Sequence, residues 1–114
     1  MGESFLHDDV VAQLARNEQL VHTIERNGGD LDEPRSIDFF FYANSHGDAL
    51  KLAADLETRG FEVFVPDEPT EEKWSVQAAR TDTVTAITQP AFVEEIVRLA
   101  STYLAEFDGW GTAI

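Results

Sequence analysis

The segment Ile37 to Ala43 is the feature that most restricts how this chain can fold. Successive side chains of an extended strand point to opposite sides. One side of this segment would hold Ile37, Phe39, Phe41 and Ala43, and the other would hold Asp38, Phe40 and Tyr42. A strand that is largely apolar on both sides is typical of the interior of a sheet, where neither side is freely wetted. The segment is therefore expected to be the central strand of a β-sheet.

A helix is expected before this strand, from about Asp8 to Asn27. Apolar residues recur there at helical spacing, at Val10, Leu14, Val21 and Ile24. The pair Gly28 and Gly29 ends the pattern, as glycine often does after a helix. The polar stretch Asp30 to Arg35 contains a proline and is the only candidate linker. Because the apolar stripe would be costly to leave in water, this helix is expected to pack on the rest of the chain or on a partner.

A second helix and a second strand follow the central strand. Ser45 is a suitable N-cap, and the apolar stripe after it comprises Ala49, Leu52, Ala53 and Leu56. Gly60 ends this helix. The next segment, Phe61 to Val65, alternates in the manner of a strand and stops at Pro66. An acidic loop from Asp67 to Glu72 comes next.

A third strand, a last helix and a last strand complete the chain. Alternation begins at Trp74, and the Thr- and Val-rich stretch Thr81 to Ile87 is expected to extend that strand. Pro90 suits the first turn of a helix. The predicted core stripe of that helix comprises Phe92, Val93, Ile96, Leu99, Ala100, Tyr103 and Leu104. The tail from Glu106 to Ile114 is expected to turn and form a short strand.

The order of elements after the first helix is β-α-β-β-α-β, which is the ferredoxin-like, or split βαβ, pattern. The sequence therefore predicts an α+β two-layer sandwich over residues 36–114, with an additional N-terminal helix over residues 1–29. Such a sheet carries its two helices on one face. Phe40, Tyr42 and Phe64 would then form an apolar patch on the open face, which needs a cover. The N-terminal helix is the nearest candidate, and a second copy of the chain, giving a homo-oligomer, is the other.

The charge of the chain limits its partners. Asp and Glu total 22 whereas Lys and Arg total 8, which gives a net charge of −14. A field of that sign repels phosphate, so direct binding of nucleic acid or of an anionic membrane is disfavoured. A basic protein partner would instead be attracted. Excess acid also keeps small proteins soluble, and a salt-tolerant source would show the same composition.

Catalytic and metal-binding patterns are missing from the sequence. The chain has no Cys, and His7, His22 and His46 are too widely spaced to form a paired-ligand motif. The adjacent acids of the pairs Asp8–Asp9 and Glu71–Glu72 would diverge, whereas general acid–base chemistry needs convergent carboxylates. We therefore expect no enzyme, no metal and no cofactor. The chain contains no cysteine, and its N-terminal residues do not resemble a secretory signal. Both features fit a cytoplasmic setting.

The most specific stretch is Asp108-Gly109-Trp110-Gly111-Thr112 near the C-terminus. It resembles the signature that closes the domain of the regulator of ribonuclease activity B (RraB) family. Shorter matches occur in the same order along the chain, at 27–30, 34–41, 59–63 and 74–76. The resemblance implies a ferredoxin-like fold and a cytoplasmic bacterial protein that inhibits a nuclease, with endoribonuclease E as the best-known target. Inhibition would come from binding the nuclease rather than from chemistry on RNA.

Two interpretations of the tail motif stay open. In the structural one, the glycines permit tight backbone turns and Trp110 plugs the end of the core. In the functional one, Trp110 and Asp108 lie at a binding edge. The candidate protein-binding residues are Asp108, Trp110, Asp38, Phe40 and Tyr42. The alternative function is a ferredoxin-like module whose open sheet face binds a small ligand or stacks nucleic-acid bases.

Overall fold

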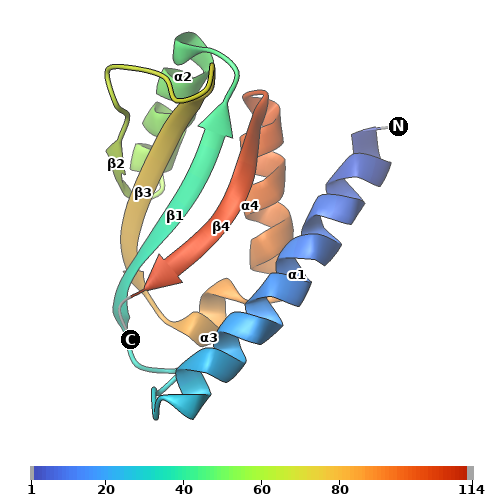
Figure 1. Ribbon diagram of the computed structural model, residues 1–114, viewed down its shortest axis with the longest axis vertical. Helices are drawn as coiled ribbons and strands as arrows, with labels where there is room; N and C mark the ends of the chain where they lie inside the picture. The colour runs from blue at the N-terminus through green and yellow to red at the C-terminus, as the bar shows by residue number, and fades with distance from the viewer. Residues whose placement is uncertain (1, 113–114) are drawn as a thin grey trace.

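The computed structural model describes the backbone of residues 2–112 and the side chains from Asp9 onward, so the side chains of His7 and Asp8 lie outside the described residues. The described residues form eight helices and strands, which carry their labels in Figure 1. They are α1 (Gly2–Arg26), β1 (Arg35–Ala43), α2 (His46–Thr58), β2 (Glu62–Phe64), β3 (Trp74–Asp82), α3 (Val84–Ile87), α4 (Pro90–Thr102) and β4 (Ala105–Thr112).

The sheet is four-stranded and antiparallel, in the order β2-β3-β1-β4. β1 pairs with β3 on one side and with β4 on the other, so the prediction that Ile37 to Ala43 is a central strand is confirmed. The α+β class is confirmed as well. The last strand is longer than expected, and Ala113 and Ile114 lie outside the described residues.

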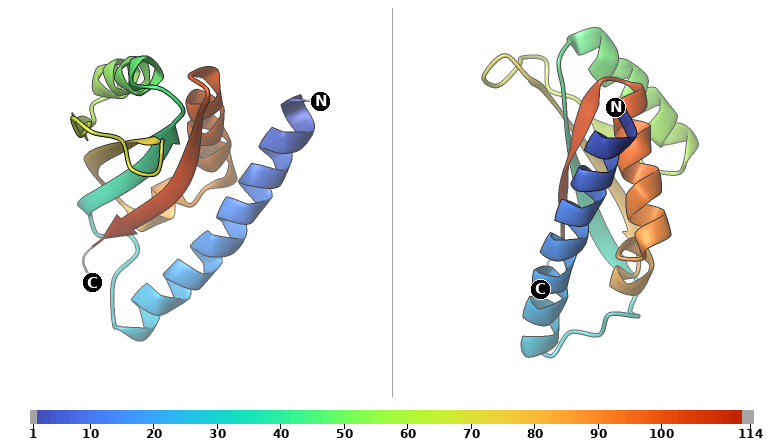
Figure 2. Two further views of the ribbon diagram at one scale, coloured as in Figure 1. Left: turned by 45° about the horizontal axis from the view of Figure 1, so that its top comes forward. Right: turned by 90° about the vertical axis from the view of Figure 1, so that its right-hand side faces the viewer.

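The helices α2 and α4 cover one face of the sheet, as Figure 2 shows. The core lies between these helices and β1, where Ile37, Phe39, Phe41 and Ala43 are fully buried. The rings of Phe39 and Phe61 meet edge to face at 5.3 Å between centroids. The alternation predicted for β1 is therefore the alternation observed, with the more apolar side turned toward the helices.

The second helix begins and ends where local chemistry predicts. Ser45 is its N-cap, and the Ser45 hydroxyl accepts a hydrogen bond from the backbone N–H of Asp48 at 3.1 Å. This bond satisfies one of the amides that have no partner within the helix. The four predicted stripe residues of α2 are all buried. Gly60, just after the helix, has a φ of +89°, a conformation that glycine adopts at little cost.

The expectation that Thr81 to Ile87 extends the third strand is wrong beyond Asp82. The segment Val84–Ile87 forms the short helix α3. The hydroxyl of Thr83 caps it by accepting a hydrogen bond from the backbone N–H of Ala86 at 3.1 Å. Threonine favours strands only where a sheet neighbour is present, and its hydroxyl can equally begin a helix.

Leu104 also departs from the prediction, because it is 67% exposed rather than part of the core stripe of α4. The helix ends at Thr102, and Leu104 has a φ of +56° in the turn that leads into β4. Helical spacing no longer applies once the backbone leaves the helix, so the last member of the stripe points into water.

The helix α1 lies beside α4 and along the outer edge of β4, as the views in Figures 1 and 2 agree. Ile24 is buried, and Val10, Leu14 and Val21 are half-buried against the core. The helix therefore does not lie over the open face of the sheet, where it was the nearest expected cover. Within residues 2–112, no helix covers that face.

Candidate functional site

The face of the sheet opposite α2 and α4, which we term the open sheet face, carries three of the predicted binding residues. Asp38, Phe40 and Tyr42 alternate with the buried residues of β1 and point to this side. Phe40 is 37% exposed, and Tyr42 is half-buried. The structure thus leaves an aromatic side chain in the middle of the open sheet face in contact with solvent.

A row of residues crosses the open sheet face at Phe40. Strand register places Gln77 of β3 beside Phe40, and Phe64 of β2 beside Gln77. Phe64 is 64% exposed, so both ends of this row are aromatic and accessible. A shallow hollow of about 390 Å³ lies over β2 and β3, lined by Glu62, Val63, Phe64, Gln77 and Ala79. The row and the hollow form one continuous surface across three strands.

The tail motif forms the other border of the open sheet face. Gly109 lies beside Phe40 in register, and a bulge leaves Asp108 as an extra, exposed residue of β4. Arg16 of α1 reaches over this bulge and donates a hydrogen bond to the carbonyl oxygen of Asp108 at 2.8 Å. Gly109 has a φ of +116°, and a Cβ there would approach the Arg16 guanidinium to 3.1 Å. The conformation favours glycine, and a side chain there would also force the Arg16 guanidinium to shift slightly.

Trp110 points to the other side of the sheet. It is 7% exposed and lies beside Phe39 in register. Its indole N–H donates a hydrogen bond to Oδ1 of Asn17 at 2.7 Å, which joins β4 to α1. Gln13 of α1 adds a second link by donating to the carbonyl oxygen of Phe107 at 3.2 Å. In this arrangement Trp110 fills the seam between α1 and the sheet, as the structural interpretation of the motif describes.

The sheet brings together four of the five candidate residues. Asp38, Phe40 and Tyr42 share the open sheet face, and Asp108 lies on its border, whereas Trp110 lies beneath it. Phe64 and Gln77 belong to the same surface but were not among the candidates. Strand alternation had already placed Phe64 on the open face with Phe40 and Tyr42, but the register that aligns it with Phe40 depends on pairing through β3.

Acidic side chains surround the aromatic row. Exposed or half-buried carboxylates stand on or beside it at Asp38, Glu62, Glu106 and Asp108. Two cations lie on the same border: Arg16, which donates to the backbone carbonyl oxygen of Asp108, and Lys73, which pairs with Glu106 at 3.8 Å. The surface therefore combines an apolar centre with a negative border.

Two further properties bear on the class of site. Among the described residues, no three His, Asp or Glu side chains are grouped closely enough to hold a metal ion. In the same part of the chain, no helix is both long and apolar enough to cross a membrane.

The family comparison agrees with the resemblance of the tail motif. No curated protein matches the chain closely enough to count as a relative. The family model described as regulator of ribonuclease activity B matches residues 14–112, which include the last half of α1 and the whole sheet. Since this match covers most of the sequence, the chain belongs to the regulator of ribonuclease activity B (RraB) family.

Proposed function

We propose that this protein is a non-catalytic regulator that binds a ribonuclease through its open sheet face and thereby reduces RNA cleavage. Membership of the RraB family supports the regulatory role. The observation that carries the binding surface is the exposed pair Phe40 and Phe64 in one row of the sheet. Endoribonuclease E, or another basic ribonuclease, is the proposed partner, and the cytoplasm is the proposed setting.

The physical basis of the proposal is complementarity. Exposed aromatic patches on a small domain are typical of interaction sites, and aromatic side chains supply much of the binding energy in protein interfaces. Ribonucleases need basic surfaces to hold phosphate. An acidic border around Phe40 would therefore suit a basic surface of the enzyme, while the aromatic row would bury apolar area.

The assignment of a ferredoxin-like fold to residues 36–114 is part of this proposal, with residues 1–29 as an added helix. The strand order supports it. In the sheet, β3 lies between β1 and β2, and these two flanking strands are connected by α2. Likewise, β1 lies between β3 and β4, and these two strands are connected by the segment that contains α4. This is the arrangement of two interleaved βαβ units.

The test is an RNA-cleavage assay with purified endoribonuclease E of the source organism. The protein is expected to lower the cleavage rate, and the double variant Phe40→Ser, Phe64→Ser should need about tenfold or more protein for the same inhibition. Leu50→Ser is the matched control, because Leu50 is an exposed apolar residue on α2, away from the open sheet face. Equal inhibition by both variants would place the binding surface elsewhere, and failure of the wild-type protein to bind or inhibit the enzyme would contradict the proposed function.

A second candidate function is binding of a small ligand or of nucleic-acid bases at the same face. The exposure of Phe40 favours it, since a buried ring could not stack on a base. The surrounding carboxylates oppose it, because they repel phosphate. A mobility-shift assay with single-stranded RNA distinguishes the two functions: RNA binding that Phe40→Ser abolishes would favour the second.

A further inference from the structure

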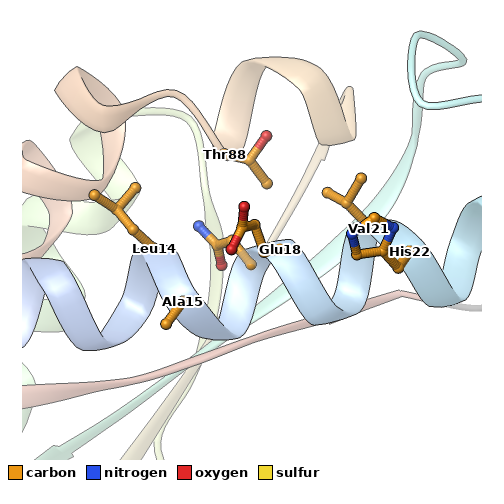
Figure 3. A pocket seen from close by; sticks show the side chains of 7 residues that line it. Leu14, Ala15, Glu18, Val21, His22 and Thr88 are labelled. Atoms are coloured by element: carbon orange, nitrogen blue, oxygen red, sulfur yellow. The ribbon is translucent and has the colours of Figure 1, made fainter.

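A groove separate from the open sheet face lies between α1 and the connection from α3 to α4 (Figure 3). Its volume is about 660 Å³. Leu14, Ala15 and Val21 supply its apolar walls, and Thr88 faces them from the α3–α4 connection. Asn17, Glu18 and His22 supply its polar atoms. We term this cavity the helix groove.

The stripe along α1 gives the helix groove its chemistry. Leu14, Glu18 and Val21 stand at i, i+4 and i+7, so one face of the helix presents a carboxylate between two apolar side chains. Figure 3 shows Leu14 and Val21 on either side of Glu18, with Thr88 opposite. Glu18 is exposed, and the apolar side chains on both sides of it would contact the aliphatic stem of a cationic side chain whose head pairs with the carboxylate.

No cation of the described residues neutralises Glu18. The ion pairs of residues 9–112 engage other carboxylates, those of Asp55, Asp82, Glu94, Glu95 and Glu106. His22 is one turn further along α1, but it forms no ion pair with Glu18 in the described structure. The helix groove therefore presents a negative charge that has no partner within this part of the chain.

The floor of the groove contributes a hydrogen-bond donor. Asn17 is buried, and its Oδ1 already accepts the indole N–H of Trp110. Its Nδ2 has no acceptor among the described residues, and Asn17 lines the groove. This Nδ2 is not among the buried side-chain atoms that lack a hydrogen-bond partner, so it meets water in the free protein, and an occupant that supplies a carbonyl oxygen would exchange that contact for a hydrogen bond.

We propose that the helix groove binds a segment of the protein partner in which an arginine or lysine adjoins a leucine-sized apolar residue. The cationic head pairs with Glu18, and the aliphatic stem and the apolar neighbour lie against Leu14 and Val21. A backbone carbonyl of the segment accepts from Asn17 Nδ2. This inference rests on the proposed function, because it takes the occupant of the helix groove to be part of the protein partner. The helix groove is nevertheless a second surface, separate from the open sheet face.

The experiment is an NMR titration of the full chain, at low salt, with the tripeptide acetyl-Leu-Arg-Leu-amide. Chemical-shift changes should concentrate on the methyl groups of Leu14 and Val21 and on the side-chain amide of Asn17. The matched probes acetyl-Leu-Glu-Leu-amide and acetyl-Gly-Arg-Gly-amide should bind more weakly, because the first lacks the cation and the second lacks the apolar side chains. An equal response to all three probes would overturn the proposal.

Two variants separate the helix groove from general attraction to an acidic protein. Glu18→Gln should weaken binding of acetyl-Leu-Arg-Leu-amide by about two- to fivefold, the range expected for an exposed ion pair. Glu57→Gln removes the same charge from an exposed position on α2 and should leave binding unchanged. Equal losses in both variants, or shifts scattered over the acidic surface, would overturn the proposal. Because the titration contains no nuclease, its failure is distinct from a failure of the cleavage assay.

Discussion

Gly109 shows how strongly a single residue of the tail motif is constrained. Its φ of +116° lies in a region that residues with a side chain rarely adopt, and a Cβ there would lie only 3.1 Å from the Arg16 guanidinium. Gly111, two residues later, has no such φ, and its nearest neighbour would be the Phe40 ring at an ordinary 3.8 Å. Of the two glycines in the motif, only the first is demanded by the backbone.

We therefore predict different costs for the two alanine substitutions. Gly109→Ala should lower the free energy of unfolding by about 1–3 kcal/mol, because it strains the backbone and displaces Arg16. Gly111→Ala should change that free energy by no more than about 0.5 kcal/mol, as substitutions without steric conflict usually do. Urea unfolding followed by circular dichroism measures both, and equal effects would show that the backbone at Gly109 is not strained.

At the scale of elements, α2 and α4 are joined by a small polar network. The Tyr103 hydroxyl, just after α4, donates to Asp55 of α2 at 2.6 Å. Arg59 donates to the other oxygen of the same carboxylate at 2.9 Å, and it also reaches Glu95 of α4. The hydrogen bond from Tyr103, followed by that from Arg59, holds the pKa of Asp55 below its usual range.

This network predicts a pH dependence of stability. Because the pKa of Asp55 is lower in the folded than in the unfolded chain, its ionised form stabilises the fold above the unfolded pKa of about 3.9. That stabilisation is lost as the pH falls through the lowered folded pKa. Tyr103→Phe removes the largest cause of the lowering, so the variant should be less stable than wild type at pH 7. The difference should shrink below about pH 4.

Urea unfolding of both proteins across the acidic range provides the measurement for Asp55, and an NMR titration of its carboxyl group reports the pKa directly. In Tyr103→Phe this pKa should move toward the usual range. A constant stability difference at every pH would mean that the hydroxyl acts through packing rather than through the charge of Asp55.

At the scale of the whole molecule, the net charge of −14 should steer a basic ribonuclease toward this protein. The acidic β2–β3 loop contributes to that field. Glu71 and Glu72 form its tight turn, where Thr70 and Lys73 pair through their backbones. Both glutamates are exposed and have positive φ values of 50° and 67°. The turn therefore holds two carboxylates out in solvent, in a conformation that Asn-Gly would adopt more readily.

We predict that association with endoribonuclease E slows as salt rises, by about tenfold or more between low and high ionic strength. Electrostatics should act mainly on the association rate, while the aromatic row should determine the dissociation rate. The loop variant Glu71→Asn, Glu72→Gly keeps the turn, removes two charges and should associate more slowly. Glu25→Gln, Glu57→Gln removes two exposed charges from helices as the control. Stopped-flow kinetics that do not depend on salt would refute steering.

The sequence by itself determined those features of the fold that depend on residues close together in the chain. Alternation from Ile37 to Ala43 was enough to predict a central strand and its buried side. Ser45 and Gly60 were enough to predict where α2 begins and ends. The tail motif was enough to indicate the family. These features depend on side-chain direction, capping and backbone conformation, which neighbouring residues control.

Only the tertiary structure decided which surfaces are covered and which are open to solvent. Trp110 meets Asn17 across 93 positions of sequence, so nothing local could show that its ring is covered by α1. Thr83 caps a helix instead of extending a strand, and the first helix lies along β4 instead of over the open sheet face. Such outcomes depend on which distant elements supply buried contacts and hydrogen-bond partners, and a local pattern does not contain that information.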